Sequence, residues 1–300
     1  MEKEKLRSRA EHYARALELP TDAIADILAA FDKIAADGAC FAEFSAMVTA
    51  YEQQEGDWHF TPMLDACREI CERCAVHEYT GGFLLHLCLC DGLLAHYRAR
   101  GIDEQIFWSS IADLAYKMEE CRLVKGINGS FVCPWFDGFF KLTRFALGRL
   151  QFELEPLKNS YTCAGRVLPA GSMALSVHIP RTGTRLAHSE VEASYRMAKE
   201  FFAKEFAGGP TVFTCASWLL DPWNLTVLSE QSNLYAFCKD YEIVKVSTYQ
   251  GYEQVWRLFD CAYTGDPDAL PQDSSLRRAY VARMKRGETL GSARGIFLME

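Results

Sequence analysis

The chain has 300 residues, 49% of them hydrophobic and 24% charged, which is typical of a globular protein with room for two domains. Its formal net charge of -8 argues against nucleic acid or an anionic membrane surface as the main partner. No apolar stretch approaches the roughly 20 residues that span a bilayer, and the charged start Met1-Glu-Lys-Glu-Lys5 shows no signal peptide. We therefore expect a cytoplasmic protein without membrane contact.

Helical periodicity continues through about the first 120 residues. Pro20 ends the first predicted helix, Thr61-Pro62 fits the start of the fourth, and Thr80-Gly-Gly82 predicts a break before the fifth. The predicted helices span residues 6–19, 21–38, 40–53, 61–77, 83–100 and 104–121. Six helices without a clear strand predict an all-helical N-terminal domain.

The chain contains twelve cysteines, and most lie within apolar periodic segments. In a reducing compartment such thiols are expected to be small core residues. Cys67, Cys71 and Cys74, followed by His77, share one stripe of a helix, where a metal ion could bind. Structural zinc sites usually draw their ligands from two separate turns, so a buried helix face is favoured and no metal is expected.

The pattern changes after residue 121. Residues 124–132 contain an Asn-Gly turn and predict a short hairpin, and residues 135–147 predict an aromatic helix. Residues 148–155 then alternate, with Leu150, Phe152 and Leu154 on one face of a strand and polar residues on the other. We place the domain boundary between residues 121 and 148, giving domains 1–145 and 146–300.

A strand, loop, helix and strand follow one another in the middle of the second half. They are predicted at 173–179, 181–187, 190–206 and 211–219, with Ser189 and Glu192 as a capping box. Such a crossover implies neighbouring parallel strands. Its loop presents two arginines and backbone N–H groups at a helix N-terminus, which favours a phosphate-bearing ligand, although many such loops bind nothing.

The remaining predicted elements are a helix at 224–239 broken near Ser232, a strand at 241–247, helices at 251–259 and 274–286, and a strand at 295–299. Strands and helices that alternate in this way predict an α/β domain with a mixed sheet. The fold class is therefore α+β, an all-helical domain followed by an α/β domain.

Several short strings in this second half carry a resemblance to a known family. They are Gly148-Arg-Leu-Gln-Phe-Glu153, Val177-His-Ile-Pro180, Ser217-Trp-Leu-Leu-Asp-Pro222, Ser232-Asn233, Ser275-Leu-Arg-Arg-Ala-Tyr280 and Arg294-Gly-Ile-Phe297. In this order they resemble a bacterial family of two-domain acyltransferases with a helical N-terminal domain and a GNAT-like C-terminal domain. The resemblance covers most of residues 135–300 and implies acyl-CoA as co-substrate and a small-molecule amine or peptide as acceptor.

The resemblance also implies roles for individual residues. In GNAT-like folds acyl-CoA lies where the strand before the crossover helix splays from its neighbour, with its pyrophosphate on the following loop. Glu153 is the expected base, His178 a base or orienting group, and Tyr235 the acid for the leaving thiolate. Expected CoA contacts are Val177, Ile179, Arg181, Gly183, Thr184, Arg185 and Asn233, and expected acceptor contacts are Gln151, Ser217 and Asp221.

Other interpretations of these residues stay open. The loop from Arg181 matches the glycine-rich GNAT loop only in part, with Arg185 where a small residue is expected. A non-catalytic binding or regulatory module that keeps the fold is therefore the alternative, and a metal-dependent helical domain is a third. Glu153 could pair with Arg149 or Gln151, and Asp221-Pro222 could form a turn. Tyr241 and Tyr249 are alternatives to Tyr235 as the acid.

Overall fold

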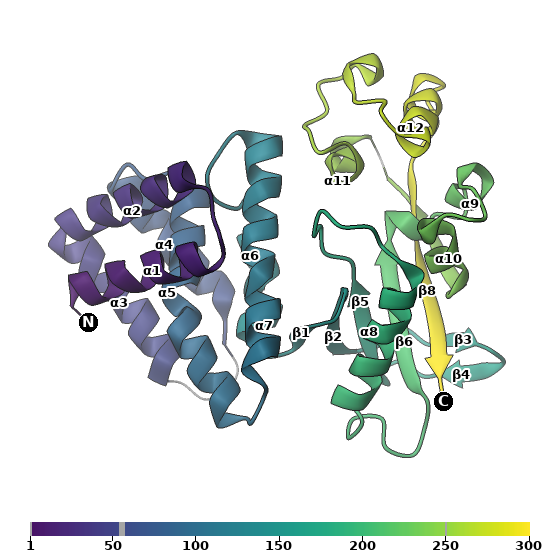
Figure 1. Ribbon diagram of the computed structural model, residues 1–300, viewed down its shortest axis with the longest axis horizontal. Helices are drawn as coiled ribbons and strands as arrows, with labels where there is room; N and C mark the ends of the chain where they lie inside the picture. The colour runs from purple at the N-terminus through teal and green to yellow at the C-terminus, as the bar shows by residue number, and fades with distance from the viewer. Residues whose placement is uncertain (1, 54–57, 250) are drawn as a thin grey trace. The chain divides into compact units, whose positions relative to one another are not determined.

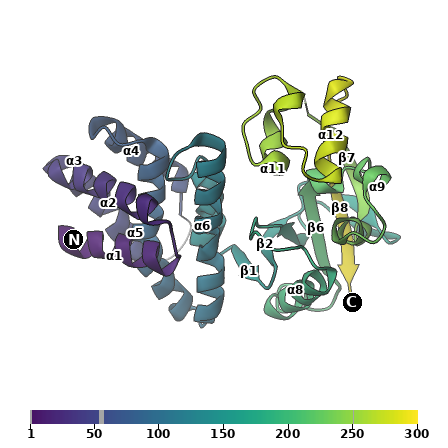
Figure 2. The ribbon, with the colours of Figure 1, turned by 45° about the horizontal axis from the view of Figure 1, so that its top comes forward.

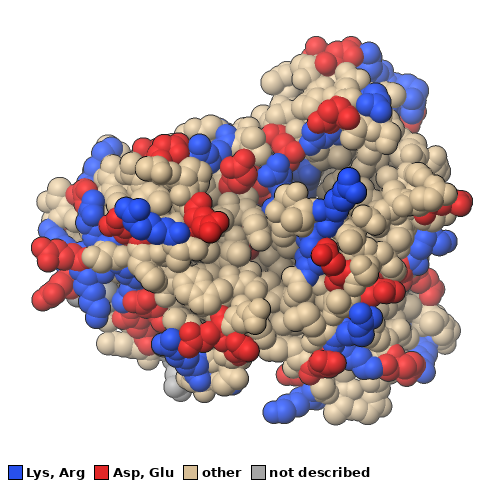
Figure 3. Space-filling view, in the orientation of Figure 1, with Lys and Arg blue, Asp and Glu red and all other residues tan. Residues whose placement is uncertain are grey.

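The computed structural model of the chain describes residues 2–53, 58–249 and 251–300. The chain forms two compact units, Met1–Phe145 and Ala146–Glu300. Figure 1 shows helices in the first unit and a sheet with helices around it in the second. On the face drawn in Figure 3, acidic and basic side chains are interspersed.

The first unit is helical, as the periodicity predicts. Its helices are α1 (Lys3–Ala16), α2 (Thr21–Ala36), α3 (Gly38–Gln53), α4 (Phe60–Arg73), α5 (Glu78–Ala99) and α6 (Glu104–Lys125), followed by a 3₁₀ turn (Cys133–Phe136) and α7 (Asp137–Phe140). Helix α5 is the centre of this unit because α1, α2, α3, α4 and α6 all pack against it. Its side chains from Phe83 to Cys90 are all buried, so apolar residues on every side of this helix are covered.

The predicted break at Thr80-Gly-Gly82 is wrong, because these residues lie within α5. Helix α4 ends earlier than predicted, at Arg73, and His77 caps α5 by accepting the backbone N–H of Tyr79 at 3.1 Å. A Cβ on Gly82 would lie 2.9 Å from the Cys133 sulfur, and one on Gly81 would collide with Cys71. These glycines therefore permit close packing rather than a turn.

The hairpin predicted at 124–132 and the helix predicted at 135–147 are also wrong. Helix α6 continues to Lys125 and is ended by Gly126 in the left-handed conformation at φ +68°. The Asn-Gly pair follows this cap as a loop, in which the Asn128 carbonyl accepts a hydrogen bond from Thr80 Oγ1. After α7 the chain enters strand β1 (Arg144–Leu147) instead of continuing as a helix.

The second unit contains the predicted mixed sheet. Its strands are β2 (Leu150–Pro156), β5 (Met173–His178), β6 (Thr211–Ser217), β7 (Glu242–Thr248) and β8 (Gly291–Met299), and the order with β1 is β1-β2-β5-β6-β8-β7. Strands β5 and β6 are parallel, as the crossover predicts, whereas β2 with β5, β6 with β8 and β7 with β8 are antiparallel. Strand β8 is longer than expected and lies between β6 and β7 in the sheet.

One face of the sheet is aromatic and lies under helix α8 (His188–Phe201). Tyr195 of α8 contacts Phe152, Phe213 and Phe297 with ring centroids 4.8 to 6.3 Å apart. The predicted capping box is not formed, because α8 starts at His188 with Ala187 as its N-cap, and the helix ends at Phe201 rather than Phe206. Burial of these large rings fixes α8 across β2, β6 and β8.

The opposite face is partly covered by a hairpin that the sequence did not reveal, β3 (Tyr161–Cys163) with β4 (Arg166–Leu168). Its residues Cys163 and Leu168 pack with Ala174, Val212 and Ile296 of the sheet. These contacts involve the amino-terminal ends of β5 and β6. The carboxyl ends of the same two strands carry polar side chains on this face, as described below.

The remaining helices follow the end of β6 and the end of β7. They are a 3₁₀ turn (Trp218–Leu220), α9 (Asn224–Val227) and α10 (Asn233–Lys239), then 3₁₀ turns (Glu253–Val255 and Pro267–Ala269), α11 (Trp256–Phe259) and α12 (Ser275–Lys285). The helix predicted at 224–239 is interrupted before Ser232, as expected. Figure 2 shows α11 and α12 beyond one end of the sheet, where Val255, Phe259, Tyr280 and Met284 form a separate apolar cluster.

Among the described residues, no helix combines the length and the apolar character needed to cross a lipid bilayer.

Candidate active site

Strands β5 and β6 stop pairing before either strand ends. Their register contains only Leu175 with Phe213 and Ser176 with Thr214. Beyond this point β5 remains paired with β2 up to His178, and β6 remains paired with β8 up to Ser217. The carboxyl ends of the two strands are therefore not paired with each other, and we call this unpaired end of β5 and β6 the opening.

Polar side chains line one face of the sheet beside this opening. Glu153 lies opposite Ser176 and Gln151 lies opposite His178, so all four side chains share a face. Glu153 Oε2 lies 3.4 Å from His178 Nε2, and these side chains are 20% and 22% exposed. We call the surface formed by Gln151, Glu153, Ser176, His178, Thr214 and Arg294 the polar face.

The contact places the Glu153 carboxylate, which can accept a proton, next to the His178 imidazole, which can also carry one. The sequence predicted each residue but not their contact, which depends on the antiparallel register of β2 and β5. A carboxylate and an imidazole in contact can accept a proton from an amine brought between β5 and β6.

Arg294 brings a positive charge to the same face. It lies opposite Ala216 in the register of β6 and β8, and its Nη1 donates to Thr214 Oγ1 at 3.1 Å. No carboxylate in the described part of the chain forms an ion pair with this half-buried guanidinium. The sequence singled out Arg294 only as the start of a short string, because its position beside the opening depends on β8 pairing with β6.

The loop after β5 is held by Arg149, for which sequence analysis predicted no role in binding. Its Nη1 donates to the Pro180 carbonyl at 3.1 Å and its Nη2 to the Thr184 carbonyl at 3.4 Å. Its backbone N–H donates to Ser194 Oγ of α8 at 2.7 Å. Arg149 therefore ties the start of β2 both to this loop and to the helix that follows it.

The predicted loop residues have different surroundings. Gly183 adopts φ +75° at the tip, and Thr184 contacts Thr182 with hydroxyl oxygens 2.7 Å apart. Arg181 Nε donates to Asp260 Oδ1 at 2.9 Å, so this arginine anchors the loop to the end of α11. Arg185 is exposed and extends from the loop without an ion pair within the described residues.

Three predicted residues lie at turns after β6. Ser217 Oγ accepts the backbone N–H of Leu219, which caps the 3₁₀ turn. Asp221 is buried, and its Oδ2 accepts from Arg283 Nη1 at 2.9 Å. Its carboxylate also accepts the backbone N–H of Trp223, in line with the turn considered as the alternative. Tyr235 lies in the first turn of α10, next to Asn233, where Ser232 Oγ caps the helix.

A second polar cluster connects α8 to the end of α10. His188 Nε2 lies 2.9 Å from Asp240 Oδ1, and the hydroxyl oxygens of Tyr195 and Tyr241 are 2.9 Å apart. Burial raises the pKa of the Asp240 carboxyl, an effect that the contact with His188 opposes. No sequence signal indicated this cluster, because its members come from α8 and from the two residues between α10 and β7.

The structure places the cysteine stripe on α4 and at its C-terminal end. Cys67 and Cys71 are buried, and the hydrogen bond that the Cys67 thiol donates to Cys71, together with burial, raises the pKa of Cys67. Within the parts of the chain that the structure describes, no group of three or more His, Cys, Asp or Glu side chains is placed to hold a metal ion. Cys67 and Cys71 therefore lie on a buried helix face, whereas Cys74 ends α4 half-buried and the exposed His77 caps α5.

Comparison with known proteins gives consistent matches for both units. A model of the N-acyltransferase N-terminal domain matches residues 8–142, and a model of the GNAT-like C-terminal domain matches residues 144–297. A search of curated proteins found no match.

Solved structures share the complete fold. One is an acyltransferase mutant in complex with octanoyl-CoA, 23% identical over 98% of this chain and 88% of that chain, with a TM-score of 0.76. Another is an acyltransferase in complex with decanoyl-CoA and teicoplanin, 22% identical over 97% of this chain and 88% of that chain, with a TM-score of 0.73. Since the second family model alone spans more than half of the sequence, this chain belongs to the family of proteins with a GNAT-like C-terminal domain.

Proposed function

We propose that the protein is an acyl-CoA-dependent N-acyltransferase that transfers an acyl group to an amine by direct attack. The observation that carries this proposal is the unpaired end of β5 and β6 directly beside the contact between Glu153 and His178. The opening would admit a thioester, and the contact supplies a base at the same place. The structural relatives bound to octanoyl-CoA and decanoyl-CoA support acyl-CoA as co-substrate.

The opening also supports a binding mode for CoA. A backbone N–H near Val177 or His178, beyond the last pair with β6, would donate to the thioester oxygen. The pyrophosphate would lie on the loop with Arg181, Gly183 and Arg185, at the N-terminus of α8, whose N–H groups favour an anion. Ile179, Thr184 and Asn233 complete the proposed CoA contacts.

The reaction needs one proton removed and one supplied. The amine nitrogen attacks the thioester carbonyl carbon, and Glu153, assisted by His178, accepts the proton that the nitrogen loses. The carbon–sulfur bond then breaks, and the CoA thiolate takes a proton from Tyr235 at the start of α10. The products are an amide and free CoA, with no covalent enzyme intermediate.

The proposed acceptor is a small-molecule amine or a peptide amine. One structural relative was crystallised with teicoplanin, which supports an acceptor of this kind. Gln151 is buried next to His178 in the register and Ser217 ends β6, so both border the opening. Asp221 is not among the proposed acceptor contacts, because its carboxylate forms the buried ion pair with Arg283.

Calorimetry with CoA, acetyl-CoA and longer acyl-CoAs tests this proposal, combined with mass spectrometry of products from a panel of primary amines. We expect one acyl-CoA site per chain and formation of an amide. Binding of acyl-CoA without any amide product from the panel would favour the non-catalytic module. Absence of binding at millimolar acyl-CoA would contradict the proposal.

A further inference from the structure

Two cationic side chains lie on neighbouring strands at one side of the polar face. Arg294 of β8 and Lys245 of β7 are directly opposite each other in the register of these strands. Residues that are directly opposite share a face of the sheet, so Lys245 extends the polar face to the edge strand β7. Like charges in this arrangement repel each other. An anion in contact with both cations would remove this repulsion.

The chain itself supplies no such anion. Within residues 2–53, 58–249 and 251–300, neither Arg294 nor Lys245 forms an ion pair, and the Arg294 guanidinium donates to the neutral Thr214 Oγ1. Glu242, which precedes Lys245 on β7, instead accepts the backbone N–H of Ala164 at 2.8 Å. Lys245 is exposed and Arg294 is half-buried, so a ligand can reach both from solvent.

The Arg294 guanidinium lies close to the opening. Its partner Thr214 is the last residue of β6 that pairs with β5, opposite Ser176, and Ser176 is opposite Glu153. Two strand spacings, about 10 Å, therefore separate the backbone of Thr214 from that of Glu153. In the proposed reaction the amine contacts Glu153. An anion bound to Arg294 therefore lies within about 10 Å of the attacking nitrogen, a distance that one small molecule can span.

The phosphates of CoA have a different place in the proposed complex. Helix α8 packs on the aromatic face of the sheet, where Tyr195 contacts Phe213 and Phe297. Phe213 and Thr214 are consecutive on β6, so the polar face is the opposite face of the sheet. The proposed pyrophosphate site at the N-terminus of α8 is therefore on the α8 side, away from Arg294. An anion on Arg294 belongs to the acceptor.

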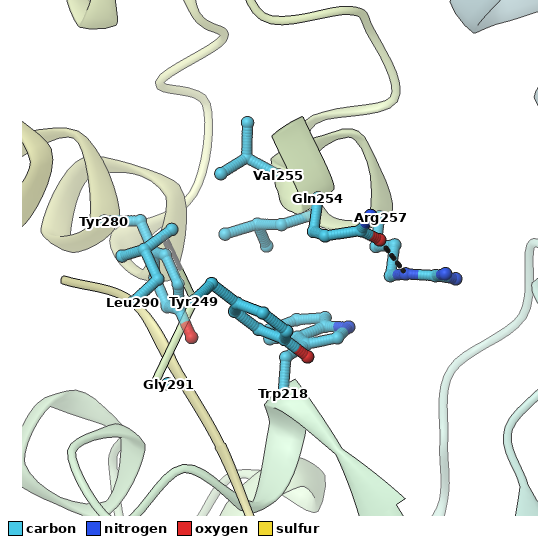
Figure 4. A pocket seen from close by; sticks show the side chains of 9 residues that line it. Trp218, Tyr249, Gln254, Val255, Arg257, Tyr280, Leu290 and Gly291 are labelled. Carbon is cyan, nitrogen blue, oxygen red and sulfur yellow. Dashed lines mark hydrogen bonds between the residues drawn. The ribbon is translucent and has the colours of Figure 1, made fainter. Parts of the chain in front are cut away.

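Figure 4 shows a pocket beyond β6 that is not an alternative place for an anion. The side chains that line it are mainly aromatic and aliphatic: Trp218, Tyr249, Val255, Leu258, Tyr280 and Leu290. Arg257, the cation of this lining, donates through Nε to Gln254 Oε1 at 3.2 Å, and its Cζ lies 4.4 Å from the ring centroid of Trp256. Such surroundings do not favour a charged group.

We propose that Arg294, together with Lys245, binds a carboxylate of the acceptor, so that the substrate is an amine that also carries a carboxylate, as an amino acid does. A guanidinium binds a carboxylate through two parallel N–H donors, and the contact with Thr214 holds the Arg294 guanidinium in place. The inference rests on the proposed acyl transfer and names the chemical class of its acceptor. A phosphate ester is also anionic, and the experiment below includes an amine of that kind.

The first measurement compares amines that differ in an anionic group. The pairs are glycine with glycinamide, 4-aminobutanoate with 4-aminobutanamide, and 2-aminoethyl phosphate with ethanolamine, each assayed with octanoyl-CoA by release of free CoA. Concentrations are expressed as the unprotonated amine, because the anionic group changes the basicity of the nitrogen. We expect kcat/KM for at least one carboxylate to exceed that for its amide by about tenfold or more.

Three results of this comparison would contradict a proposal. Equal kcat/KM for carboxylates and amides would overturn the inference while leaving the acyl transfer intact. A preference for the phosphate ester alone would overturn the assignment to a carboxylate. Failure of every amine, neutral or anionic, to give an amide would instead overturn the proposed function, and the inference with it.

The second measurement uses variants of the two cations. Arg294→Gln removes the positive charge, and Lys245→Glu places a carboxylate beside Arg294 without altering that residue. Lys158→Glu makes the same change of charge at an exposed lysine after β2, outside the polar face, and is the control. We expect Arg294→Gln and Lys245→Glu each to reduce the preference for the carboxylate over its amide by about tenfold or more. Lys158→Glu should leave this preference unchanged.

An unchanged preference in both Arg294→Gln and Lys245→Glu would overturn the assignment. A raised KM for octanoyl-CoA in Arg294→Gln, with an unchanged preference among amines, would assign the charge to CoA rather than to the acceptor. Thermal unfolding verifies that the variants are folded. Because Lys245 is exposed, Lys245→Glu decides the question even if Arg294→Gln does not fold.

Discussion

Glu153 and His178 lie on neighbouring antiparallel strands, and Glu153 Oε2 is 3.4 Å from His178 Nε2. They are diagonal neighbours, because Glu153 is directly opposite Ser176 and His178 is directly opposite Gln151. The contact places a carboxylate and an imidazole close enough for a proton to pass between them. This relationship is the centre of the proposed reaction, and it leads to the first prediction.

Replacing Glu153 with Gln should remove the proton acceptor while preserving size and hydrogen bonding. We expect kcat for amide formation to fall by about 100-fold or more, with the affinity for acyl-CoA changed less than about twofold. Glu155→Gln is the matched control, because Glu155 shares the strand and the face but lies opposite Ala174, away from the opening. A Glu153→Gln variant with the activity of the unmodified protein would exclude this carboxylate as the base.

Replacing Arg149 with Ala should release the loop after β5. Two hydrogen bonds, to the carbonyls of Pro180 and Thr184, are lost. We expect the KM for acyl-CoA to rise about tenfold, with a smaller change in kcat, because a mobile loop binds the pyrophosphate less tightly. Steady-state kinetics measures both values, and Arg196→Ala, an exposed arginine on α8, is the control. An equal KM in both variants would contradict this role.

His86 should make the stability of the helical unit depend on pH. It is fully buried among Phe60, Phe136 and Phe140, and burial lowers its pKa from 6.5 to about 4. The unfolded chain therefore binds this proton below about pH 6.5, whereas the folded chain does not bind it until about pH 4. The contribution of His86 to the free energy of unfolding is therefore constant above about pH 6.5. It decreases as the pH falls towards 4, by roughly 3 kcal/mol in total.

Urea unfolding of the protein and of His86→Leu at pH 7 and at pH 4.5 measures this contribution. The variant should lose less stability than the unmodified protein between the two pH values. An identical loss in both proteins would show that another group is responsible.

Replacing Gly81 with Ala should destabilise the contact between α4 and α5. The added methyl group would collide with the Cys71 side chain, and both residues belong to a buried helix contact. We expect a loss of about 1–3 kcal/mol, as for other overpacked cores. The double variant Gly81→Ala with Cys71→Ala should recover part of this loss, because the second change removes the obstructing sulfur. Denaturant unfolding measures both, and no recovery would point to backbone strain instead.

Much of the fold follows from local patterns in the sequence. The periodic apolar residues from Leu6 to Cys121 determine helices, since each helix must bury one stripe. The alternation at Leu150, Phe152 and Leu154 predicts a strand, and β2 forms there from Leu150 to Pro156. Local patterns predicted a helix break at Thr80-Gly-Gly82 and a hairpin at the Asn-Gly pair after α6, and both predictions are wrong. The first glycines permit close packing within α5, and the Asn-Gly pair follows the cap that ends α6.

The site depends on contacts that local patterns do not specify. Glu153 and His178 were each named from the sequence, but their 3.4 Å contact requires the register of β2 with β5. The role of Arg149 and the contact of Arg294 with Thr214 need segments far apart in the chain to meet. Sequence by itself determined the helices of residues 1–125 and the central strands of the mixed sheet, but not β1 or the hairpin of β3 and β4. Tertiary structure alone decided which side chains meet, because strand pairing and packing join residues separated by many positions.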